Sequence, residues 1–132
     1  MGKQTVKVLL DTNLLIDDLL DHPGHAVYVS SLSWAELQLG IVTGANVMIR
    51  AAREARLARL KNILGPGLPF DDAAATAYAT VARLILERGR NPKSRAIDLM
   101  IAATALAHGA GIITRNSNDF AGLESLIKVF PV

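Results

Sequence analysis

Four acidic residues stand where an α/β protein could use carboxylates for chemistry: Asp11, Glu36, Asp98 and Asp119. Asp11 directly follows the apolar residues 6–10, so we expect it at the carboxyl end of a buried strand, where open α/β sheets bind their ligands. The other three stand at comparable junctions further along the chain. Carboxylates that meet in one crevice repel each other unless cations neutralise them. If these four meet, the sequence predicts a metal site.

The other possible ligands decide which metal is expected. The chain has no cysteine, and none of its histidines, His22, His25 and His108, stands at ligand spacing. Hard oxygen donors without thiolate or imidazole favour Mg²⁺ or Mn²⁺ over Zn²⁺. We therefore expect Mg²⁺ or Mn²⁺ as the cofactor.

Each carboxylate also has a purely structural explanation. Asp11 could form an Asx-turn or cap the helix that follows, and Ser33 with Glu36 has the spacing of a capping box. Asp98 suits the positive end of a helix dipole, and Asp119 could cap a turn in a polar loop. Asp98, however, adjoins an apolar segment, where a carboxylate without a partner is costly to bury.

Strand and helix patterns alternate along the chain, which predicts a parallel sheet with right-handed crossovers. Strands are expected at residues 6–10, 27–31, 111–114 and 126–130. Helices are expected at residues 14–20, 34–42, 46–64, 73–88 and 94–106, with Asn46, Asp71 or Asp72, and Ser94 as caps. This order would bring the carboxyl ends of the first three strands, and the acids beside them, to one crevice.

The composition is that of one globular domain over residues 1–132. Hydrophobic residues make up 51% of the chain and charged residues 20%, and no apolar run reaches the length of a membrane span. Asp11 interrupts the first apolar run, so we expect no signal peptide. Together with the lack of cysteine, this favours the cytoplasm.

The net charge of +2 conceals a larger local excess of basic residues. If cations neutralise the four acids, 8 acids remain against 14 Lys and Arg, which leaves an excess of +6 that could attract a polyanion. One basic group, interpreted as a solvated helix face, comprises Arg50, Arg53, Arg56, Arg59 and Lys61. The other group precedes Asp98 and could bind phosphate or favour a helix C-terminus; it comprises Arg83, Arg88, Arg90, Lys93 and Arg95.

Four segments of the chain resemble the PIN-domain ribonucleases, specifically the toxins of VapBC toxin-antitoxin pairs. They are residues 9–13 (LLDTN), 33–37 (SWAEL) with Gly40, 98–105 (DLMIAATA) and 114–120 (TRNSNDF). Their order and spacing cover nearly the whole chain. The resemblance implies a PIN-like three-layer α/β/α sandwich around a central, mostly parallel sheet of four to five strands.

The resemblance also implies roles for individual residues. Asp11, Glu36 and Asp98 would be the metal-binding catalytic acids and Asp119 the fourth, with Asn116 as another available oxygen ligand. Polar support would come from Thr12, Asn13, Thr114 and Asn116. Contacts to RNA phosphates are expected from Lys93, Arg95 and Arg115. Because aromatic residues make up only 5% of the chain and Trp34 is expected to pack at a helix start, we expect recognition by backbone charge and RNA shape.

The activity that the resemblance implies is endoribonuclease cleavage, in which one or two divalent ions orient a water for attack on a phosphodiester. A cognate VapB-type antitoxin would inhibit it, and the toxin would be a homodimer that can assemble further with the antitoxin. Two alternatives stay open. A phosphatase with an aspartyl nucleophile would want a second acid at position 13, where Asn13 stands. A catalytically silent binding module would use the acids only as caps.

Overall fold

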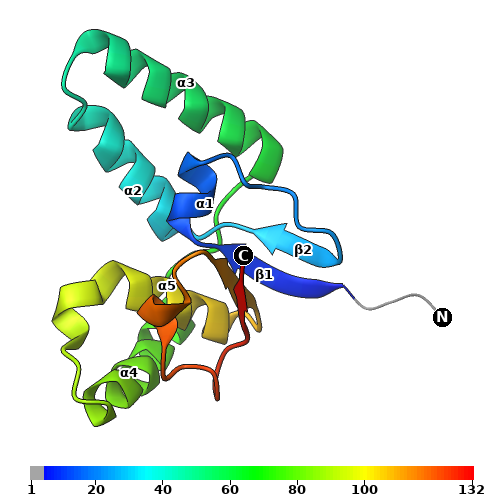
Figure 1. Ribbon diagram of the computed structural model, residues 1–132, viewed down its shortest axis with the longest axis vertical. Helices are drawn as coiled ribbons and strands as arrows, with labels where there is room; N and C mark the ends of the chain where they lie inside the picture. Colours follow the sequence, from blue (N-terminus) through cyan, green and yellow to red (C-terminus); the bar gives the residue numbers. More distant parts are fainter. Residues whose placement is uncertain (1–4) are drawn as a thin grey trace.

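The computed structural model describes residues 5–132 and contains a sheet of four strands with helices on both faces (Figure 1). The strands are β1 (Val6–Leu10), β2 (His25–Tyr28), β3 (Gly111–Thr114) and β4 (Val129–Pro131). Their spatial order is β2-β1-β3-β4, and all three pairings are parallel. The predicted parallel α/β sheet is confirmed.

Helices occupy the two outer layers. They are α1 (Thr12–Ile16), α2 (Ser31–Val42), α3 (Val47–Leu64), α4 (Asp72–Glu87) and α5 (Ala96–Ala107). Two short 3₁₀-helices cover Pro92–Arg95 and Ser117–Phe120. In Figure 1, α1, α2 and α3 lie on one side of the sheet and α4 and α5 on the other, with α2 and α3 forming a projecting hairpin. The predicted three-layer α/β/α sandwich is confirmed.

Two separate apolar clusters hold the three layers together. Alternate side chains of a strand point to opposite faces, and in β1 Leu9 packs with α4 and α5 while Val8 and Leu10 pack with α1, α2 and α3. Trp34 is buried in the second cluster, as expected for a residue that packs at a helix start. β1 therefore lies at the centre of both cores and fixes where its last residue, and Asp11 after it, can lie.

Several element boundaries differ from the prediction. Helix α1 covers residues 12–16 rather than 14–20, because the chain turns at Asp18, which has a φ of +59°. Strand β2 ends at Tyr28 rather than residue 31, and the last strand covers residues 129–131 rather than 126–130. Helix α2 begins three residues earlier than predicted, at Ser31.

The helix caps explain which boundaries were predictable. Asn46 and Asp71 cap α3 and α4 as expected, each accepting a hydrogen bond from a backbone N–H three residues ahead. The capping box of Ser33 and Glu36 is wrong, because Ser30 caps α2 instead. Ser94 is also not a cap: α5 begins at residue 96 without a side-chain cap, after a 3₁₀-helix capped by Asn91.

Gly67 allows a close approach at the start of α2. A Cβ atom there would lie 2.6 Å from the backbone nitrogen of Ser31, closer than real Cβ contacts. The neighbouring Leu68 accepts a hydrogen bond from the Ser31 N–H at 3.0 Å and donates one to the Val29 carbonyl at 2.8 Å. The segment after α3 is thereby fastened beside the first turn of α2.

No helix within residues 5–132 combines the length and the apolar character needed to cross a membrane. Residues 1–4 lie outside the described residues. They begin the N-terminal segment in which we expect no signal peptide.

Candidate metal centre

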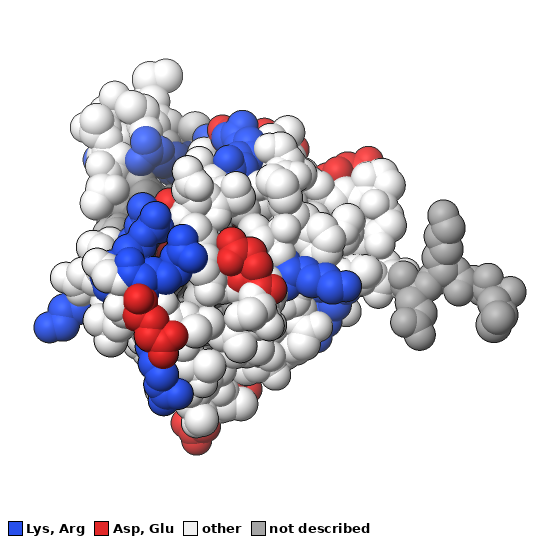
Figure 2. Space-filling view, turned by 60° about the horizontal axis from the view of Figure 1, so that its bottom comes forward, with Lys and Arg blue, Asp and Glu red and all other residues white. Residues whose placement is uncertain are grey.

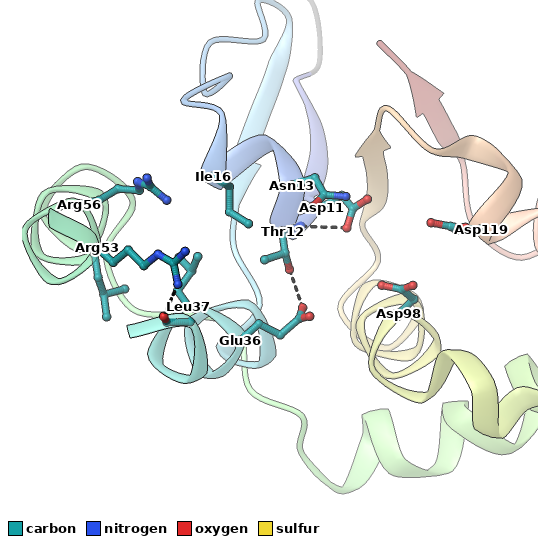
Figure 3. Close-up of a pocket in the computed structure, with 12 residues that line it drawn as sticks. Asp11, Thr12, Asn13, Ile16, Glu36, Leu37, Arg53, Arg56, Asp98 and Asp119 are labelled. Carbon is teal, nitrogen blue, oxygen red and sulfur yellow. Dashed lines mark hydrogen bonds between the residues drawn. The ribbon is translucent and has the colours of Figure 1, made fainter. Parts of the chain in front are cut away.

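The four predicted carboxylates line one cavity of about 430 Å³ at the carboxyl end of the sheet (Figure 3). Asp11 follows β1, Glu36 lies on α2, Asp98 lies in the first turn of α5, and Asp119 lies in the 3₁₀-helix after β3. This is the crevice that parallel α/β sheets offer to ligands. The fold therefore brings together residues that lie far apart in the sequence.

Asp11 is buried, and neighbours hold both of its carboxylate oxygens. Oδ1 accepts a hydrogen bond from the Thr12 backbone N–H at 2.8 Å, and Oδ2 accepts one from the Thr114 hydroxyl at 2.7 Å. Burial raises the pKa of Asp11 above its usual value, while the hydrogen bonds from Thr114 and Thr12 oppose that rise. Asp11 is both the cap of α1 and a side chain of the cavity.

Glu36 is held by a chain of hydroxyl groups. The Thr12 hydroxyl donates to Glu36 Oε1 at 2.7 Å and lies 2.8 Å from the Ser33 hydroxyl. Since Thr12 uses its one proton on Glu36, Ser33 must donate to Thr12. Ser33 is fully buried, so its hydroxyl supports the site and does not cap the helix.

Asp98 is half-buried and is surrounded by like charge. Burial, followed by repulsion from Asp11, Asp119 and Glu36, raises the pKa of Asp98 to about 6, and Arg95 opposes the rise. Because Asp98 senses the charge of all three other acids, the four act as one electrostatic cluster. Such a cluster favours a cation.

Asp119 is paired with Arg95, whose Nη1 donates to Asp119 Oδ1 at 2.7 Å. Arg95 was predicted as an RNA contact, and in this structure its guanidinium is engaged with an acid of the cavity. Arg115, predicted for the same role, forms an ion pair with Asp17 at the end of α1. Lys93 is exposed on the 3₁₀-helix before α5 and does not line the cavity.

The predicted supporting residues have different positions. Thr12 and Asn13 line the cavity. Thr114 is fully buried and reaches the cavity through Asp11. Asn116 is exposed and does not line it; its backbone N–H donates to the Thr114 hydroxyl at 2.9 Å. Of the two candidates for a fourth ligand, only Asp119 lines the cavity.

The donor chemistry of the cavity fits a hard divalent cation. Carboxylate oxygens are the ligands that Mg²⁺ and Mn²⁺ prefer, and the mutual repulsion at Asp98 is what a cation would relieve. As the side chains lie, no group of three Asp, Glu or His residues within residues 5–132 is arranged to hold an ion. Asp11, Glu36 and Asp119 each bind a hydrogen-bonding partner instead. Metal coordination by the four acids stays a prediction.

Sequence reasoning missed the opposite wall of the cavity. Arg53 and Arg56 of α3 line it together with Ile16, Leu37 and Leu57 (Figure 3). Their interpretation as part of a solvated face is wrong, since both are half-buried. The sequence contained one signal for this wall. Arg53 precedes the buried Leu57 by four residues, which places Arg53 on the buried side of the helix, and Arg56 directly precedes Leu57.

One face of the molecule carries its charge in small groups. On the face shown in Figure 2, Lys and Arg side chains lie close to Asp and Glu side chains, with wide uncharged areas between these groups.

Comparison with known proteins agrees with this geometry. The family described as "PIN domain" matches residues 8–124. Toxin FitB of Neisseria gonorrhoeae is 31% identical over 127 residues, covering 86% of this chain and 90% of FitB. Ribonuclease VapC5 of Mycobacterium tuberculosis is 35% identical over 103 residues, covering 78% of this chain and 73% of VapC5.

A solved structure shares the whole fold. VapBC-5 of Mycobacterium tuberculosis, a member of the VapBC family of toxin-antitoxin systems, matches with a TM-score of 0.79 and 32% identity. The match covers 96% of this chain and 99% of that chain. All four carboxylates of the cavity fall within the matched residues 8–124, and the chain belongs to the PIN-domain family, alongside toxins of the VapC type.

Proposed function

We propose that this protein is the toxin of a type II (VapBC) toxin-antitoxin system and acts as an endoribonuclease that depends on Mg²⁺ or Mn²⁺. The observation that carries the proposal is the single cavity lined by Asp11, Glu36, Asp98 and Asp119 in a PIN-domain chain. The relatives named Toxin FitB and Ribonuclease VapC5 support the toxin and ribonuclease assignments.

The four carboxylates would hold the cation. A divalent ion bound there supplies positive charge for the phosphodiester and makes water a stronger nucleophile near neutral pH. The chain itself keeps the ligands in place. Thr114 and the Thr12 amide orient Asp11, and the Thr12 hydroxyl, fixed by Ser33, orients Glu36. This support limits the side-chain freedom that binding would otherwise have to remove.

The proposed partners are an RNA substrate, a cognate VapB-type antitoxin and a second copy of the chain, in an assembly located in the cytoplasm. Support for an antitoxin comes from the solved relative VapBC-5, which belongs to a toxin-antitoxin family. An antitoxin that covers the cavity would block access to all four carboxylates at once, because they share one opening.

Cleavage of RNA by the purified chain tests the proposal. We expect cleavage of single-stranded RNA with Mg²⁺ or Mn²⁺, none with EDTA, and a loss of at least about a hundredfold in Asp98→Asn, since a preorganised charged group is removed. Asp21→Asn is the matched control, because Asp21 is exposed and does not line the cavity. Equal activity of Asp98→Asn and the control would refute the nuclease. No cleavage by any protein with either ion would favour the catalytically silent module.

A further inference from the structure

Two arginines of α3 face the carboxylates across the cavity. Arg53 and Arg56 are half-buried and line the same space as the four acids. In Figure 3 both point from α3 toward the cavity, with Ile16 and Glu36 between them and Asp98. The cavity therefore has an acidic side and a basic side.

The pairing of these arginines differs from that of their neighbour on α3. Arg59 forms two hydrogen bonds to Asp18, at 2.9 and 3.0 Å. Arg53 donates to the Gly40 carbonyl at 2.6 Å, which fixes the guanidinium but leaves its positive charge without an acid. Arg56 has no hydrogen-bond or ion-pair partner among residues 5–132. The basic side of the cavity thus carries two charges that no acid neutralises by contact.

The shape and lining of the cavity indicate what these charges would bind. A volume of about 430 Å³ lies within the range of about 300–1,000 Å³ typical of ligand pockets. Ile16, Leu37 and Leu57 provide apolar surface beside the arginines, which suits the flat face of a base or a ribose. Guanidinium groups bind phosphate oxygens with two parallel hydrogen bonds. The combination fits one nucleotide unit of a single strand.

We infer that Arg56, with Arg53 beside it, binds a non-scissile phosphate of the RNA strand, so that the strand runs from α3 across the apolar floor to the carboxylates. This inference rests on the proposed ribonuclease function. A second cavity supports the path: it adjoins the first at Asp119 and is lined by Arg90, which among residues 5–132 donates only to a backbone carbonyl, and by Arg95, which is paired with Asp119. The acids therefore have basic residues on both sides, as a strand that passes through the site requires.

The salt dependence of RNA binding tests the inference directly. In an Asp98→Asn background with constant Mg²⁺, Arg56→Gln should weaken binding of a single-stranded RNA about tenfold at moderate salt. The slope of log affinity against log salt should fall in magnitude by about 0.7, the value for one phosphate contact on a single strand. Arg53→Gln should act in the same direction. In the active chain, Arg56→Gln should raise KM for RNA more than it lowers kcat.

Two further variants distinguish the loss of a phosphate contact from a general effect of substitution on RNA binding. Arg83→Gln removes one charge from an exposed position of α4 that lines neither cavity, and its slope should equal that of the parent. Arg56→Lys keeps the charge and should keep the slope, even though it loses the paired hydrogen bonds. A slope reduced as much in Arg56→Lys as in Arg56→Gln would overturn the inference, because the effect would then not depend on charge.

Further outcomes distinguish this inference from the function on which it rests. If the parent chain cleaves RNA but Arg56→Gln and Arg83→Gln have equal affinities and slopes, the ribonuclease stands and the inference is overturned. If the chain binds RNA without cleaving it, the ribonuclease fails, while the two slopes still decide the role of Arg56. If Arg56→Gln binds an oligoglutamate peptide more weakly than the parent but binds RNA equally well, the inference is overturned. The ligand of Arg56 would then be an acidic protein segment.

Discussion

Asp98 combines a cost to the stability of the fold with a proposed role in binding the cation. Its carboxylate is half-buried near three other acids, which raise its pKa, and the partly exposed Arg95 opposes that rise. A group of this kind is a candidate functional residue because the fold holds it against its ordinary ionisation. The stability of the fold and the binding of a cation therefore make opposite demands on the charge of Asp98.

In metal-free protein, Asp98→Asn should raise the melting temperature at pH 7.5 by about 2–6 °C, although the same substitution should reduce RNA cleavage at least about a hundredfold. The pKa of Asp98 is about 6 in the fold and 3.8 in the unfolded chain, so the folded protein binds the extra proton. The stability from this proton is fully present below pH 3.8 and is lost as the pH rises through 6. Thermal unfolding in EDTA should therefore show little difference between the two proteins near pH 4. A variant less stable than the parent at pH 7.5 would contradict the prediction.

Addition of Mn²⁺ should raise the melting temperature of the parent chain more at pH 7.5 than at pH 5. At the lower pH Asp98 is largely protonated, and a proton competes with the cation for the same oxygen. The comparison is thermal unfolding with Mn²⁺ and with EDTA at both pH values. Asp98→Asn should show a much smaller increase, and an equal increase in this variant would place the ion elsewhere.

Thr114→Val should lower both stability and activity by removing one hydrogen bond to Asp11. The Asp11 oxygen would stay buried without its donor, which costs about 1–3 kcal/mol. Thr104→Val is the matched control, because Thr104 is equally buried and its hydroxyl donates only to a backbone carbonyl. Chemical denaturation and RNA cleavage together check the prediction. A loss of activity as large in the control as in Thr114→Val would refute the role of Thr114.

The elements show what could be predicted from sequence and what could not. Local signals sufficed for the first strand and for the caps Asn46 and Asp71, because each depends on neighbours within a few residues. The start of α2 was missed because Ser30 and Ser33 have similar local chemistry. Only the contact of Ser33 with Thr12, 21 positions away, assigns it to the site.

The difference between local signals and contacts across long sequence distances also explains which residues of the candidate site could be predicted. The carboxylates could be predicted because Asp11 follows a buried strand and all four stand in recognisable segments of a PIN domain. For the arginines of α3, the spacing to Leu57 indicates only the buried side of the helix, because the other walls of the cavity come from distant parts of the chain. A basic residue on the buried side of a helix has the same sequence pattern whether it packs against protein or meets a ligand.

Two glycines, Gly40 within α2 and Gly67 beside its first turn, should respond to alanine in opposite directions. Gly67→Ala should destabilise the protein by about 1–3 kcal/mol, because the new Cβ would overlap the Ser31 backbone. Gly40→Ala should stabilise it by about 0.5–1 kcal/mol, because a Cβ there meets no atom within 4 Å and alanine favours the helix. Denaturant unfolding measures both. A neutral Gly67→Ala would show that the 66–68 segment can move away from α2.

At the scale of the whole molecule, the cavity lies where two independent cores meet. One core joins the sheet to α4 and α5, which carries Asp98; the other joins it to α1, α2 and α3, which carry Glu36 and the arginines. Neither layer of helices alone carries all four carboxylates. Binding of a cation and an RNA strand across the cavity would therefore also tie the two layers of helices together.

The hydrogen bond from Thr114 to Asp11 also bears on the timing of synthesis. It joins positions that are 103 residues apart, and β1 gains its second neighbour only when β3 has been made. A chain still on the ribosome at residue 110 holds Asp11, Glu36 and Asp98 but has neither Thr114 nor Asp119. Under the proposed function, an unfinished chain would lack a complete cavity, so RNA cleavage would begin only after residues up to Asp119 have been translated.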